Sequence, residues 1–201
     1  MKHILLLSIS VLYLAIAQGQ LNKKTWLVGG SGSFYSYKQD FRTITGNAVY
    51  KITNIEVSTS LGYFILEKFA VGLRPSFSSE KTKGISSSSG LVGSGHTERW
   101  AIGPFARYYF LEKNKSFNIL ADISYQLGQL IHLGAMHEKG KNNNLSVMAG
   151  TEIFFNTSAG LEILLGYSDK IFSIENSPGE FSNEKKGFQV SVGFVLHLEK
   201  N

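Results

Sequence analysis

The sequence predicts an all-β protein, an eight-stranded antiparallel up-and-down transmembrane β-barrel preceded by a cleavable signal peptide. Three observations support this fold class: an N-terminal apolar run of signal-peptide length, eight segments in which apolar residues alternate with small or polar ones, and connections that alternate between short and long. Side chains alternate across a strand with period two, so each such segment has one apolar and one polar face. The chain has no cysteine, so we expect no disulfide framework. Its length of 201 residues suits a single folded domain.

The first residues have the pattern of a secretory signal peptide. Lys2 precedes an apolar run over residues 4–16, and the small residues Ala17 and Gly19 follow it. Cleavage is expected after one of these two small residues. A retained helical anchor would need about 20 apolar residues, more than this run contains. The predicted segments are residues 1–19, the signal peptide, and residues 20–201, the outer-membrane barrel.

Eight strands follow from the alternation. They are expected near residues 24–37, 49–64, 69–78, 99–110, 117–128, 145–155, 161–168 and 187–198. Residues 187–198 show the pattern most clearly, because every second residue is Phe, Val or Leu and most of the others are small or polar. Pro75 and Pro104 fall inside strands. Since proline removes a ladder donor, we expect a bulge at each.

Alternation does not say which face points inward, and a soluble lipocalin-like ligand-binding barrel also alternates. Three features favour a membrane. The polar face is mostly small, which suits a narrow lumen, and tight turns after the second, fourth and sixth strands alternate with longer polar loops. Aromatic residues also gather near both ends of the strands, as two membrane interfaces favour. The residues chosen as lipid-facing are Val190, Val192, Phe194, Leu161 and Ile163.

The inward faces carry five charged residues at similar predicted depth. If the short turn at residues 156–158 pairs the flanking strands directly, Glu152 and Glu162 become cross-strand neighbours and repel each other. Asp122 adds a third acid, and Arg74 and Arg107 are the cations nearest the short turns. Because long side chains reach across so narrow a lumen, we predict that these five residues form an ion-pair cluster closing the periplasmic half of the barrel.

The unit LGYFILEKFAVGL at residues 61–73 and the segment GFQVSVGFVLHL at residues 187–198 resemble the small eight-stranded outer-membrane β-barrel family of OmpA/OmpX type. The resemblance covers nearly the whole chain after residue 19. It implies a place in the outer membrane of a Gram-negative-type cell. It also implies outer-membrane lipid and lipopolysaccharide as surroundings, and the barrel-assembly machinery as a partner during insertion.

We find no catalytic, cofactor-binding or metal-binding set. His132, His137 and Glu138 lack the fixed spacing that a metal site needs, so we interpret them as solvated loop residues. The formal net charge of +5 is small, and the basic residues are not clustered in a run. Both observations argue against nucleic acid as a partner. We expect a monomeric, non-enzymatic surface barrel acting in envelope structure, surface interaction or adhesion. The alternatives are a lipid A-modifying enzyme or a narrow solute pore, although side chains just fill the interior of an eight-stranded barrel.

Overall fold

A computed structural model describes residues 21–43, 46–87, 93–112, 115–133, 137–174 and 181–199. The expected signal peptide, residues 1–19, lies outside the described residues. Eight strands make up the fold: β1 (Thr25–Thr43), β2 (Gly46–Leu66), β3 (Phe69–Ser87), β4 (Ser94–Tyr109), β5 (Phe117–Leu133), β6 (His137–Phe154), β7 (Ala159–Ile174) and β8 (Phe181–Glu199). In the described part of the chain, no helix is long and apolar enough to span a membrane.

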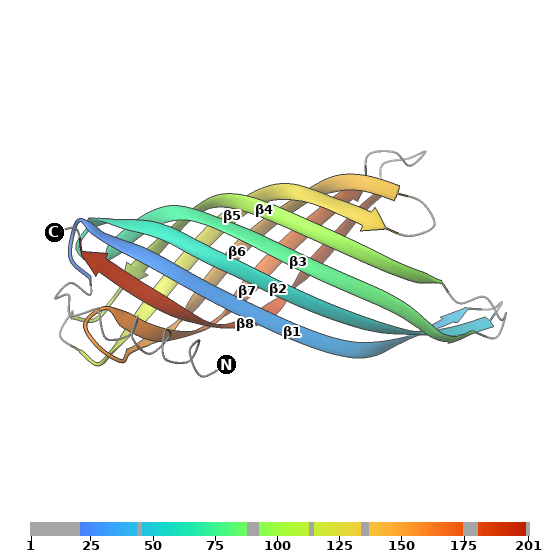
Figure 1. The fold of residues 1–201 in the computed structure, drawn as a ribbon, viewed down its shortest axis with the longest axis horizontal. Helices are drawn as coiled ribbons and strands as arrows, with labels where there is room; N and C mark the ends of the chain where they lie inside the picture. The colour runs from blue at the N-terminus through green and yellow to red at the C-terminus, as the bar shows by residue number, and fades with distance from the viewer. Residues whose placement is uncertain are drawn as a thin grey trace, which may run out of the picture.

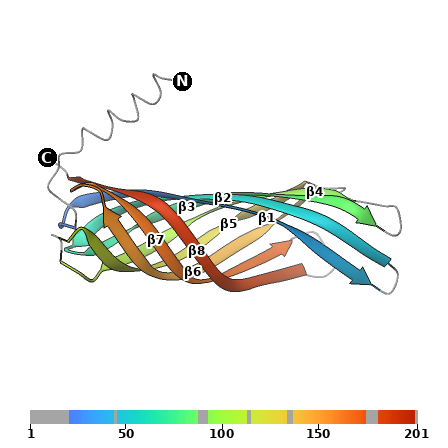
Figure 2. The ribbon, with the colours of Figure 1, turned by 90° about the horizontal axis from the view of Figure 1, so that it is seen from below.

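The strands close into one antiparallel barrel in the order β1 to β8, and β8 pairs back onto β1 (Figures 1 and 2). The beginning of β1 and the end of β8 lie at one end, together with the β2–β3, β4–β5 and β6–β7 connections. We call this the turn end and the opposite one the loop end. Local chemistry fixes these turns: Lys68 has a φ of 64°, and the Asn156 side chain accepts hydrogen bonds from the backbone of Ser158 and Ala159, each at 2.8 Å.

The strands extend farther toward the loop end than the sequence predicts. The expected polar loop over residues 137–144 is the first part of β6, and it pairs with β5 from Leu133↔His137 to Gln126↔Asn144. A β-ladder needs only backbone groups, so polar residues can continue it once the strand leaves the apolar zone. Both faces carry polar residues there, so the period-two pattern on which the prediction depended is absent.

Apolar side chains cover the outside of the barrel over its middle. On β8, Val190, Val192 and Phe194 are exposed outward, and Val192 is 48% exposed whereas Val195, on the inward face of the same strand, is 1% exposed. On β7, Ile163 is exposed and Leu161 is half-buried. This arrangement is inside out relative to a soluble barrel, because large apolar side chains face outward along the strands, whereas the charged and polar side chains that are buried face the lumen.

The two prolines do not produce bulges, so that prediction is wrong. Around Pro75, β2 and β3 keep one register, from Ser58↔Ser76 to Leu61↔Leu73. Around Pro104, β4 and β5 do the same, from Ile102↔Leu127 to Phe105↔Ser124. The ladder is interrupted at each proline without inserting a residue. Next to the first proline, Gln126 Nε2 donates to the Arg74 carbonyl at 2.7 Å, so a side chain satisfies that backbone oxygen.

Candidate functional site

An aromatic plug fills the lumen at the turn end. We define it as Phe64, Tyr109, Phe154 and His197, all of them buried. The imidazole of His197 lies 5.7 Å from the Phe64 ring and 5.6 Å from the Phe154 ring, measured between centroids. Aliphatic residues complete the packing: Leu21, Leu27, Leu120, Met148, Leu164 and Val195. Buried side chains from all eight strands therefore meet in the lumen at this end.

A charge cluster lies next to the plug, on its loop-end side. Arg74 holds Asp122 through two bonds, Nη1 to Oδ1 at 2.6 Å and Nη2 to Oδ2 at 2.8 Å. Arg107 reaches the same carboxylate with Nε at 2.9 Å and Glu162 with Nη1 at 2.7 Å. The Arg107 side chain is 1% exposed and that of Asp122 is fully buried. The structure thus brings Arg74, Arg107, Asp122 and Glu162 into one chain of charge-assisted hydrogen bonds.

The fifth predicted member, Glu152, has different partners. It is the register partner of Glu162 across β6 and β7, yet its carboxylate accepts from the Tyr109 hydroxyl at 2.7 Å and lies 2.8 Å from His197 Nε2. Among the described side chains, Tyr109 joins Glu152 to the arginines, because its hydroxyl is also 3.5 Å from Arg107 Nη1. The two glutamates therefore do not share one cation.

The cluster predicted from the sequence included neither Tyr109 nor His197. The sequence did not indicate how far along the barrel axis these two side chains lie. The depth of His197 follows from the closure of β8 onto β1, where Leu27 pairs with His197. No short turn connects these two strands, so no local feature of the sequence fixes their register.

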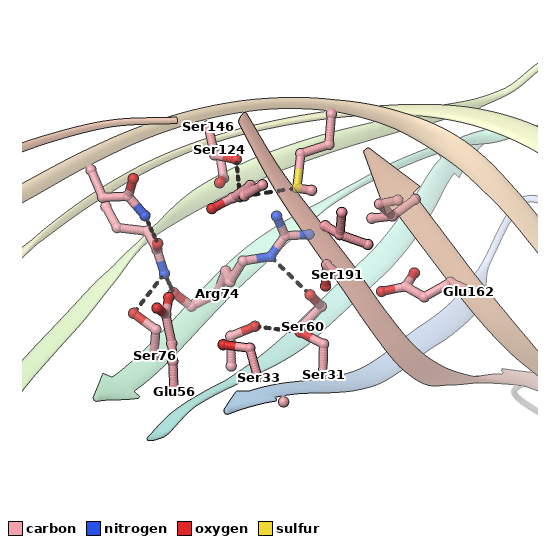
Figure 3. Close-up of a pocket in the computed structure, with 18 of the residues that line it drawn as sticks. Ser31, Ser33, Glu56, Ser60, Arg74, Ser76, Ser124, Ser146, Glu162 and Ser191 are labelled. Atoms are coloured by element: carbon pink, nitrogen blue, oxygen red, sulfur yellow. Dashed lines mark hydrogen bonds between the residues drawn. The ribbon is translucent and has the colours of Figure 1, made fainter. Parts of the chain in front are cut away.

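Above the charge cluster the lumen opens into a cavity of about 360 Å³ (Figure 3). Serine is the commonest residue of its wall, with Ser31, Ser33, Ser58, Ser60, Ser76, Ser124, Ser146 and Ser191. Arg74 crosses its floor and donates from Nε to Ser60 at 3.0 Å. Nearer the loop end, Lys170 Nζ lies 3.1 Å from both oxygens of Glu56. The formal charges that face this cavity are therefore paired, and the rest of its polar wall is neutral.

His132, which sequence reasoning placed in a loop, lies in β5, and its Nδ1 is 2.8 Å from the Thr97 hydroxyl. The side chains of His137 and Glu138 lie outside the described residues. Among the side chains that are described, no group of three or more His, Cys, Asp or Glu residues is placed to hold a metal ion.

A closed eight-stranded barrel with an apolar exterior and a polar, internally packed lumen defines the architecture of the small outer-membrane β-barrels. The chain has this fold. A comparison of structures finds similarity to the outer membrane protein OprG from Pseudomonas aeruginosa, with a TM-score of 0.58 and 14% identity over 91% of this chain and 99% of that one. At this identity the likeness is one of fold.

Two further barrels resemble the chain more distantly. The N-terminal β-barrel domain of OprF from Pseudomonas aeruginosa has a TM-score of 0.45 and 11% identity, over 88% of this chain and 98% of that one. Neisserial surface protein A has a TM-score of 0.43 and 16% identity, over 86% of this chain and 94% of that one. Neither a family model nor a curated protein sequence matches the chain.

Proposed function

We propose that the protein is a monomeric, non-enzymatic barrel of the outer membrane that acts as a rigid scaffold for the strand extensions at its loop end. Its turn end faces the periplasm. The apolar exterior supports contact with lipid, and the closed order of strands supports membrane insertion because lipid offers backbone groups no other partners. The polar extensions, such as the first residues of β6, support exposure of the loop end to water.

The observation that carries this proposal is the sealed periplasmic half of the lumen. Arg107 joins Asp122 and Glu162 across the barrel at 2.9 Å and 2.7 Å, and the aromatic plug lies directly below. Removing one member of such a buried cluster leaves the others as uncompensated charges, so the cluster resists opening. A sealed barrel of this kind holds its outer strands in place and does not pass solute.

Two measurements test the proposal. In the first, unboiled and boiled outer-membrane fractions are compared on a gel, where a closed barrel that resists detergent should migrate differently before boiling. Recovery of the protein only as a soluble periplasmic species would overturn the membrane placement.

In the second, the purified protein is inserted into planar bilayers. We expect no steady conductance from the wild type, and a rise only in a variant that opens the seal, such as Arg107→Ala combined with Tyr109→Ala. Steady conductance of the wild type would favour a narrow pore instead. Lipid A from cells with and without the gene should be identical by mass spectrometry, and a difference would indicate an enzyme.

A further inference from the structure

The barrel wall is not paired equally around its circumference. Strand β1 pairs with β2 as far as Thr43↔Gly46, and β7 pairs with β8 as far as Ile174↔Phe181. Between β1 and β8, however, the ladder runs from Thr25↔Glu199 only to Gly32↔Val192. Beyond this pair, β1 and β8 diverge toward the loop end (Figure 1). We call the gap between residues 33–36 of β1 and residues 188–191 of β8 the seam.

The seam lies within the apolar zone of the barrel. The outward residues of β8 are apolar from Phe188 to Leu198, a stretch as long as the roughly 9–11 residues with which a strand crosses a bilayer. Lys186 and Glu184 follow toward the loop end and mark where water begins. The ladder ends at Val192, near the middle of this stretch, so the seam occupies its loop-end half.

Backbone groups that face hydrocarbon without a hydrogen-bond partner are costly, so the unpaired backbone of an open seam needs polar groups nearby. The serine-lined cavity provides such groups. Its lining includes Ser33 at one edge of the seam and Ser191 at the other, so the cavity reaches the gap from inside. On the outside, Phe34 and Phe188 flank the gap, and Phe188 is 93% exposed. The seam thus joins a polar chamber to an apolar rim.

We propose that the seam is a lateral portal for an amphiphile with a neutral, polyhydroxylated head and an alkyl tail, the head occupying the serine-lined cavity and the tail lying along the outer leaflet. This proposal rests on the membrane placement proposed above. The volume of about 360 Å³ falls within the range of small-ligand sites.

The chemistry of the wall selects the head. Arg74 is bound to Asp122 and Ser60, and Lys170 is bound to Glu56, so neither cation is available to an ionic head group. Serine hydroxyls and the amides of Gln126 and Gln189 can both donate and accept, as the hydroxyls of a sugar or glycerol require.

The tail has room on the outer surface. Gly30 and Gly32 face outward beside the last pairs of the ladder, and a Cβ built on either would approach only a backbone oxygen, at 3.9 Å and 3.8 Å. This bare strip lies next to Val192 and leads from the seam toward the middle of the apolar zone.

The absence of cysteine permits a direct test with single-cysteine variants in phospholipid vesicles. Ser191→Cys places a thiol at the seam, Ser146→Cys places one on the intact cavity wall, and Val192→Cys places one on the outer face. The probe is a phospholipid that carries a maleimide on an acyl chain and cannot leave the bilayer, and labelling is followed by intact mass. We expect Ser191→Cys to react about tenfold faster than Ser146→Cys and at a rate near that of Val192→Cys, because thiol modification depends on access.

Equal, slow labelling of the cysteines at 191 and 146 would show a closed seam and overturn the portal. Absence of labelling at 192 would overturn the membrane placement instead, so the two failures are distinguishable. The ligand class is tested with dodecyl maltoside and maltose, each as protection of Ser146→Cys against a water-soluble methanethiosulfonate. We expect dodecyl maltoside to slow the reaction about fivefold and maltose, which lacks the tail, to leave it unchanged. Equal protection by the two, or none by either, would overturn the proposed amphiphile.

Discussion

Replacing Arg107 with methionine removes the cation that joins the two sides of the charge cluster. The side chain is 1% exposed and bonds to Asp122 at 2.9 Å and to Glu162 at 2.7 Å. Asp122 keeps both of its bonds to Arg74, so the main loss falls on Glu162, which is left without a cation in a buried site. Removing one partner of a buried pair costs about 3–5 kcal/mol, and we expect Arg107→Met to lower the free energy of unfolding by that amount.

Urea unfolding in phospholipid vesicles, followed by tryptophan fluorescence, measures this loss. A second substitution, Glu162→Gln, removes the stranded carboxylate and should return about 0.5–3 kcal/mol in a double-mutant cycle. Glu152→Gln is the matched control. Its carboxylate bonds to Tyr109 and His197 and not to Arg107, so it should return less. If the losses from Arg107→Met and Glu162→Gln simply add, the ion pair is not coupled and the reasoning fails.

Three further substitutions follow from the same geometry. Tyr109→Phe removes the donor that Glu152 accepts at 2.7 Å and should cost about 1–3 kcal/mol in the same unfolding assay; no loss would mean that another group replaces the hydroxyl. Val192→Arg places a charge on the outer face near the middle of the bilayer and should cost about 2–4 kcal/mol. If this variant inserts into vesicles as efficiently as the wild type, the faces are assigned wrongly. Gly103→Ala would bring a Cβ into the backbone carbonyl oxygen of Tyr125 on β5 and should cost about 1–3 kcal/mol. A Cβ in Gly187→Ala meets no atom within 4 Å, so this control should be neutral, and equal effects of the two changes would contradict the close packing of β4 on β5.

The centres of the strands could be predicted because each must present apolar residues outward at every second position, as in residues 187–198. The strand extensions could not, since the polar residues that begin β6 pair with β5 but lack the alternation of apolar residues that marks a strand. The opposition of Glu152 and Glu162 follows from a three-residue turn, and the structure pairs them. The bond between Glu152 and His197 depends on closure of β8 onto β1, whose register no turn determines.

The charge cluster needs a paired wall beside it, and this requirement limits how far the seam can extend toward the turn end. Glu162 pairs with Gly193, and Gly193 pairs with Ser31, so the cluster shares a row with the last part of the β1–β8 ladder. A Cβ on Gly193 would lie 2.6 Å from the Gly30 carbonyl oxygen and 3.2 Å from a Glu162 carboxylate oxygen, so glycine leaves space for both the neighbouring strand and the carboxylate. Buried ion pairs hold the barrel together only while lipid and bulk water are kept away from them, and this row of the wall is paired. One row farther toward the loop end the ladder stops. The cavity wall beside this point consists of the neutral hydroxyls of Ser33 and Ser191, which tolerate water. An opening placed any nearer the turn end would expose Glu162, and this accounts for a ladder that stops at Gly32 and Val192 and no earlier.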